Sequence, residues 1–81
     1  MPHGRMKAQA EALGFSYSHK GCPCNGTPLV YTRRVDNYIY TLNIWEKRNV
    51  WRLTKRGALL ATGNKDNLTN KIQEIWDFSK N

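Results

Sequence analysis

The stretch YIYTLNIWEKRNVWRLT, residues 38–54, decides the fold of this chain. Two runs of aromatic and branched aliphatic residues, 38–45 and 50–54, flank the polar turn EKRN, which is the pattern of a β-hairpin. A four-residue loop over 46–49 sets one register for the two strands. The cross-strand pairs of that register are Trp45–Val50, Ile44–Trp51, Asn43–Arg52, Leu42–Leu53 and Thr41–Thr54.

Side chains in a strand alternate between two faces, so this register predicts one apolar face and one polar face. The apolar face, which we expect to be the core, collects Tyr40, Leu42, Ile44, Trp51 and Leu53. The polar face, which we call the open face, collects Thr41, Asn43, Trp45, Val50, Arg52 and Thr54. A preceding hairpin through Asp36 and Asn37 adds Leu29 and Tyr31 to the core, and Thr32 and Arg34 to the open face. Trp51 is therefore predicted to be buried. Trp45 is predicted to be exposed, unless the N-terminal helix or the loop around residues 22–26 covers it.

Strand and turn signals continue on both sides of the hairpin. Residues 29–62 have the pattern of an antiparallel meander of about four strands. The segment FSYSHK, residues 15–20, has the composition of a further short strand. Residues 20–28 hold two glycines, two prolines and an Asn-Gly pair, so we expect a loop that contains the Cys-Pro-Cys sequence.

Two amphipathic segments enclose the meander. Residues 5–14 are rich in helix formers, with an apolar stripe of Met6, Ala10 and Leu13 and with Gly14 and Phe15 placed to close the C-terminal cap. Residues 65–79 predict a longer helix with Asn64 or Asp66 as N-cap and an apolar stripe of Leu68, Ile72, Ile75 and Trp76.

Residues 1–81 therefore predict a single small basic domain of the α+β class. An antiparallel meander of about four strands carries a C-terminal helix packed on one face and a short N-terminal helix. A three-stranded sheet backed by a C-terminal helix is similar in layout to the DNA-binding domains of some plant transcription factors and of phage-type integrases. The similarity is one of layout, and no functional residue is carried over from it.

The positive charge is concentrated in the strands. The chain has a net charge of +7. Residues 33–56 carry seven basic and two acidic side chains, which gives that segment +5. A focused positive field attracts polyanions, of which nucleic acid is the commonest partner of small basic domains.

The chain shows no sign of a membrane or export segment. No apolar run approaches the roughly 18 residues of a membrane span, and the N-terminus lacks the apolar core of a secretory signal. We expect a cytoplasmic protein that does not bind membranes.

The Cys-Pro-Cys sequence allows three readings. His19, Cys22 and Cys24, with His3 as a fourth ligand, have the donor types of a zinc site, but one residue between the cysteines is fewer than zinc sites use. A disulfide across Cys-x-Cys is disfavoured by strain and by a cytoplasmic location. We therefore expect two reduced cysteines in a tight loop, and no metal or other cofactor.

The polar residues do not predict an enzyme. The six acidic residues are scattered over turns, caps and the polar sides of helices, and no pair is spaced for acid–base catalysis. The segment GCPCNG, residues 21–26, lacks the Lys-Ser/Thr ending of a phosphate-binding loop.

The combined pattern predicts a nucleic-acid-binding protein, for duplex or single-stranded DNA or RNA, that presents a basic hairpin and sheet face. A two- or three-stranded ribbon fits the major groove of DNA. We expect the binding residues to be Arg34, Asn43, Trp45, Lys47, Arg48, Arg52, Lys55 and Arg56. The alternative is a protein–protein interaction or inhibitor module of a phage or mobile element, which binds an acidic partner or forms a homodimer through the open face.

Overall fold

The computed structural model describes residues 5–79, and the side chains of residues 5–75. The helical elements are α1 (Arg5–Ala12), the short 3-10 turn η1 (Pro23–Asn25) and α2 (Leu68–Ser79). The strands are β1 (Ser16–Lys20), β2 (Leu29–Val35), β3 (Tyr38–Trp45), β4 (Val50–Lys55) and β5 (Ala58–Gly63).

The five strands form one antiparallel sheet in the order β1-β2-β3-β4-β5, a meander in which each strand pairs with its neighbours in sequence. The α+β class and both helices are confirmed, but the sheet has five strands rather than about four. The fifth strand is β1, whose five side chains are all exposed. Its pairing with β2 is interrupted between Tyr17 and His19. This strand lies within residues 15–20, whose composition indicated a further short strand outside the four of the meander.

The predicted register of β3 and β4 is confirmed at every pair, from Trp45 opposite Val50 to Thr41 opposite Thr54. The predicted position of β2 is also confirmed, because Leu29 lies opposite Ile44 and Tyr31 opposite Leu42. The predicted core side chains of β3 and β4 are all buried, with Trp51, Leu42 and Leu53 fully so.

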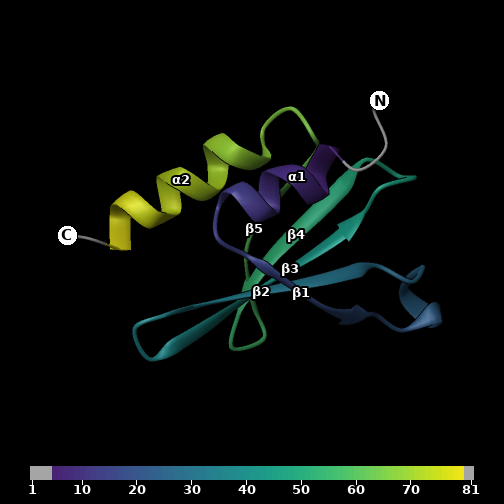
Figure 1. The fold of residues 1–81 in the computed structure, drawn as a ribbon, viewed down its shortest axis with the longest axis horizontal. Helices are drawn as coiled ribbons and strands as arrows, with labels where there is room; N and C mark the ends of the chain where they lie inside the picture. Colours follow the sequence, from purple (N-terminus) through teal and green to yellow (C-terminus); the bar gives the residue numbers. More distant parts are fainter. Residues whose placement is uncertain (1–4, 80–81) are drawn as a thin grey trace.

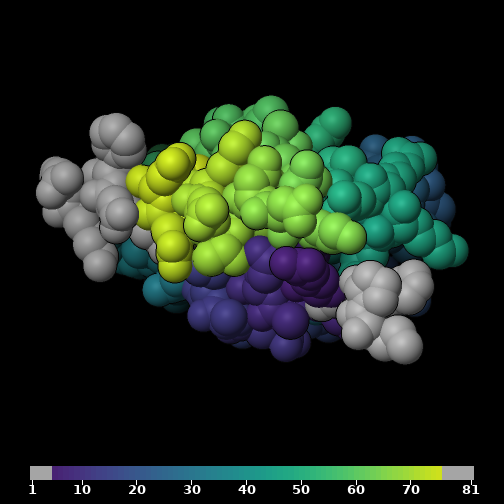
Figure 2. Space-filling view, turned by 90° about the horizontal axis from the view of Figure 1, so that it is seen from above, coloured from purple at the N-terminus to yellow at the C-terminus, as the bar shows by residue number. Residues whose placement is uncertain are grey.

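Both helices pack on the same face of the sheet (Figure 1). Seen from above, α1 and α2 lie side by side and together form one layer over the strands (Figure 2). The helical side chains in the core are Met6, Ala10, Leu13, Leu68 and Ile72, with Ile75 packed at its margin. The predicted contribution of Trp76 lies outside the described side chains. Neither helix covers the open face, so the helix cover considered for Trp45 is not found.

The end of α1 forms the predicted cap. The amide of Phe15 donates to the carbonyl of Ala10, and the amide of Gly14 donates to that of Glu11, each at 3.0 Å. These two bonds define a Schellman motif, and Gly14 adopts the left-handed φ of 90° that it requires. Phe15 is 3% exposed, so the cap closes against the core as expected.

The start of α2 differs from the prediction. The helix begins at Leu68, which makes Asn67 the preceding residue in place of Asn64 or Asp66. The Oδ1 atom of Asn67 accepts from the amide of Asn64 at 2.8 Å instead of capping the helix. The side chain of Gln9 in α1 caps it: Gln9 Oε1 accepts from the Thr69 amide at 3.2 Å and from the Thr69 hydroxyl at 2.7 Å.

Within residues 5–79, neither helix combines the length and the apolar character that crossing a bilayer requires.

Candidate functional site

The centre of the open face is built from two cross-strand rows of side chains. One row runs Thr32, Thr41, Thr54 and Leu59 over β2 to β5, and the next runs Val30, Asn43, Arg52 and Thr62. Asn43 and Arg52 lie directly opposite each other in the middle of the sheet. Arg52 is exposed and Asn43 is half-buried, so a polar pair occupies the centre of the face that the helices leave bare.

Trp45 lies at one end of this face and is held by the η1 turn. Its indole N–H donates to the backbone carbonyl of Asn25 at 2.5 Å. A Cβ atom built on Gly26 would lie 3.4 Å from the indole, which is ordinary van der Waals distance, so the turn lies directly beside the ring. Trp45 is half-buried. The loop considered as cover for Trp45 therefore reaches the edge of the ring, while the rest of the side chain remains on the open face.

Arg52 stacks on Trp45. Its guanidinium carbon lies 5.5 Å from the centre of the indole ring, within cation–π range. Such a contact is worth about 0.5–1 kcal/mol at an exposed site. Among the described residues, no carboxylate pairs with the Arg52 guanidinium. The guanidinium therefore lies over the ring while the Arg52 side chain stays exposed to solvent.

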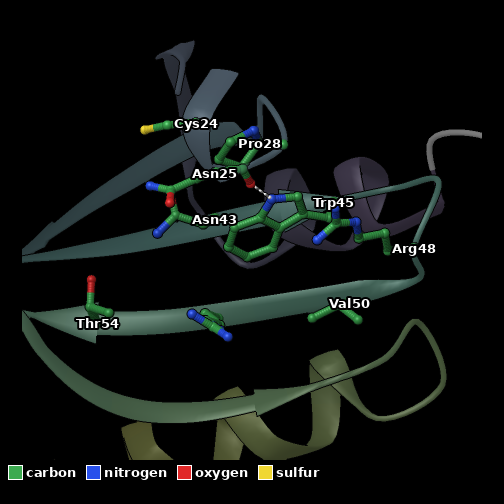
Figure 3. A pocket seen from close by; sticks show the side chains of 10 residues that line it. Cys24, Asn25, Pro28, Asn43, Trp45, Arg48, Val50 and Thr54 are labelled. Carbon is green, nitrogen blue, oxygen red and sulfur yellow. Dashed lines mark hydrogen bonds between the residues drawn. The ribbon is translucent and has the colours of Figure 1, made fainter. Parts of the chain in front are cut away.

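A cavity of about 520 Å³ opens around this stack (Figure 3). The η1 turn and Pro28 form one wall, and β3 and β4 form the floor. The lining residues are Cys24, Asn25, Gly26, Pro28, Asn43, Trp45, Arg48, Val50, Arg52 and Thr54. Among these described residues there are two arginines and no carboxylate, so the cavity is a positively charged recess with one aromatic surface.

The eight predicted binding residues are not all brought together. Asn43, Trp45, Arg48 and Arg52 share the cavity. Lys47, next to Arg48 in the same turn, is absent from that lining and borders a second hollow that shares Trp45 and Arg48 with the cavity.

Arg34 lies on the open face opposite Ile39, near the far end of the sheet.

Lys55 and Arg56 do not join the cavity. Lys55 lies opposite Tyr40 and therefore points to the helix side of the sheet, where its ammonium is 4.4 Å from the ring centre of Tyr38. The Arg56 guanidinium also lies over the Tyr38 ring, at 5.8 Å. The period of two in a strand places residue 55 on the same side as the buried Leu53, which accounts for the separation.

Sequence reasoning missed the residues of the η1 turn and Pro28. They belong to the loop between β1 and β2, and the hydrogen bond from the Trp45 indole to the Asn25 carbonyl joins that loop to β3. The glycine and proline content of residues 21–28 predicted a loop, which was considered as a cover for Trp45 but not as part of the binding site.

The prediction of two reduced cysteines is wrong in this structure, because Cys22 and Cys24 are joined by a disulfide. The η1 turn brings their Cα atoms to 5.2 Å, inside the usual range for disulfides. Disulfide sulfurs are not thiolates, so the zinc reading loses two of its ligands. Over residues 5–79, no three His, Cys, Asp or Glu side chains are grouped to hold a metal ion. His19 contacts the Ser18 hydroxyl at 2.9 Å, and His3 is outside the described residues.

Burial raises the pKa of the Tyr31 hydroxyl above its usual value near 10, and the charges of Glu11 and Glu46 add to the shift. Tyr31 belongs to the core, so this shift describes the helix side of the sheet and not the cavity.

Comparisons of the chain with protein-family models, with curated proteins and with solved structures found no match.

Proposed function

We propose that this protein binds nucleic acid through the open face of its sheet. The observation that carries the proposal is the cavity in which two arginines, an amide and an indole converge without a carboxylate among the described residues. Proteins that bind nucleic acid combine cations for phosphates with polar and aromatic side chains for bases. The cavity provides all three kinds of group on one side of the sheet.

The position of each side chain suggests its role in binding nucleic acid. Arg48 lies at the rim, in the turn between β3 and β4, where it can meet a phosphate. Arg52 and Asn43 are cross-strand neighbours at the centre, so a guanidinium and an amide lie within reach of the same base edge. Trp45 offers the aromatic surface.

The test removes the two arginines together. Arg48→Ala with Arg52→Ala should weaken binding of nucleic acid at low salt by at least tenfold, because both cations leave the cavity. Thermal stability should stay nearly unchanged, since Arg48 and Arg52 are both exposed. Fluorescence anisotropy with labelled oligonucleotides measures the affinity.

A charge-matched control separates the site from the overall charge. Lys7→Ala with Lys71→Ala also removes two positive charges, from exposed positions on α1 and α2. This control should bind almost as well as the wild type. Equal losses in the two double variants would show that only net charge matters and would remove the open face from the proposal.

The alternative, a protein partner or a homodimer, draws support from apolar side chains on the same face. Ile39 is 54% exposed and Leu59 is 58% exposed. Both lie toward the end of the open face that is distant from Trp45. Sedimentation of the free protein distinguishes a homodimer, which should dissociate when Leu59→Ser and Ile39→Ser are introduced, from a monomer that these substitutions leave unchanged.

A further inference from the structure

We infer that the ligand of the open face is single-stranded, with one unpaired base held in the cavity beside Trp45. This inference rests on the proposed function and narrows it, because the chain alone was equally compatible with a ribbon that enters the major groove of a duplex. Three features of the structure favour the single strand: the width of the sheet, the wall formed by the η1 turn, and the stack of Arg52 on Trp45.

The sheet is too wide for the major groove. Strands lie roughly 4.7–4.9 Å apart, so five strands span about 19 Å between the axes of the outer two. The major groove of B-DNA is about 12 Å wide and admits a ribbon of two strands. Here β3 is the central strand of five, with β4 beside it. Asn43 and Arg52, which lie on these inner strands, cannot reach the floor of that groove while the outer strands flank them.

The η1 turn closes the remaining approach at Trp45. β2 does not extend to the level of Trp45, because its first residue, Leu29, lies opposite Ile44. The turn takes its place, and Asn25 binds the indole N–H. A duplex presents only the edges of its bases inside grooves, so its bases cannot lie against an indole that is recessed between a turn and a strand.

An unpaired base has the right shape and chemistry for the cavity. The volume of about 520 Å³ lies within the roughly 300–1,000 Å³ of sites that enclose small ligands. Aromatic rings and guanidinium planes both stack on bases, and Trp45 and Arg52 provide one of each in contact. Asn43 can bind the edge of the stacked base, while Arg48, on the other side of the indole, can bind its phosphate (Figure 3).

The experiment compares three labelled probes at low salt: a 12-nucleotide oligothymidine, a 12-nucleotide oligouridine and a 12-base-pair duplex. At least one single strand should bind ten times more tightly than the duplex. Trp45→Ala should weaken single-strand binding roughly ten- to a hundredfold, which is the typical loss for one stacked base. Trp45→Phe keeps a ring without the N–H donor, and it should retain most of the affinity.

Tyr38→Ala is the matched control, because Tyr38 is also an exposed aromatic under a cation but lies with Lys55 on the helix side of the sheet. It should change the affinity less than twofold. If Trp45→Ala fails to fold, iodide quenching of tryptophan fluorescence gives a second measurement. A Trp76→Phe protein keeps only Trp45 and Trp51, and Trp51 is 0% exposed, so iodide quenches the fluorescence of Trp45. A bound single strand should protect Trp45 from this quenching.

The outcomes separate the two levels of the proposal. Absence of binding to all three probes overturns the proposed function itself. Duplex binding that equals or exceeds single-strand binding overturns this inference and leaves the proposed function standing. Single-strand binding without a loss in Trp45→Ala, or without protection of Trp45 from iodide, overturns the placement of the base.

Discussion

The two tryptophans of the central hairpin, six residues apart, have opposite environments. Trp51 is fully buried, and its indole N–H donates to the carbonyl of Asn64 at 2.8 Å, in the loop that leads to α2. Trp45 is half-buried and donates to Asn25 across the open face. In each case the N–H finds a backbone acceptor, as a partly or fully buried indole requires. The same residue type therefore anchors the core in one strand and forms part of the candidate site in the next.

Trp51→Ala should destabilise the protein severely. The substitution removes a large side chain from the centre of the core and leaves a cavity, which typically costs about 3–5 kcal/mol. A domain of this size has little stability to spare, so the variant should unfold at a much lower urea concentration or be unfolded in buffer. Urea unfolding followed by circular dichroism measures the loss.

Leu59→Ala serves as the comparison, since Leu59 is 58% exposed on the open face and should cost little when truncated. A Trp51→Ala protein as stable as Leu59→Ala would contradict the burial of Trp51 and the register that places it opposite Ile44.

At the scale of elements, Gln9 joins the two helices. Its amide nitrogen donates to the Lys65 carbonyl at 2.8 Å, and its oxygen accepts from the backbone and side chain of Thr69. The helix α1 has only eight residues, which is too short to be stable alone. Its packing and its hydrogen bonds to the start of α2 therefore hold it in place.

Gln9→Ala should lower the free energy of unfolding by about 1–2 kcal/mol, because the first turn of α2 loses a capping acceptor. Gln73→Ala, an exposed glutamine on α2, is the matched control and should change stability by less than about 0.5 kcal/mol. Chemical unfolding of both variants measures the difference. If the two variants prove equally stable, the cap contributes nothing to the docking of α1.

The elements also differ in how far local patterns predicted them. The central strands were predicted with their register, because apolar residues on alternate positions specify which side is buried. The end of α1 was predicted because glycine at a helix end has one common geometry. The start of α2 was missed, since its cap comes from a residue 60 positions away.

At the scale of the whole molecule, the positive charge is not spread evenly over the two sides of the sheet. Arg33, which adds to the charge of the strands, donates to the carbonyl of Leu13 on the helix side. Lys55 lies over tyrosine rings on that side as well. The cations that remain for the open face are chiefly arginines: Arg34, Arg48 and Arg52.

The affinity for nucleic acid should therefore fall as the salt concentration rises, with a slope that depends on how many of these arginines contact phosphates. Each phosphate neutralised on a single strand contributes about 0.7 to the slope of log affinity against log salt. Phosphate contacts by Arg34 and Arg48 predict a slope of about −1.4 for the wild type, since Arg52 is placed at the base. The variant that combines Arg48→Ala and Arg52→Ala should have a slope shallower by about 0.7, measured by anisotropy titrations between low and moderate salt. A slope that is the same in both proteins would show that Arg48 does not contact a phosphate.

The sequence by itself determined the α+β class, the pairing of β3 with β4 and the separation of Trp45 from Trp51. It could do so because strand alternation and turn length are local properties of the chain. The grouping of Asn43, Trp45 and Arg52 on one face follows from the same alternation.

The tertiary structure alone decided that both helices cover the same side of the sheet, and that the disulfide-bonded η1 turn lies against Trp45. It also showed that the short strand indicated at residues 15–20 joins the meander as β1, which makes the sheet wider than the major groove. These features arise from contacts between residues far apart in the chain. Local sequence patterns do not predict such contacts, because the free energy that favours them is gained only when the elements pack together.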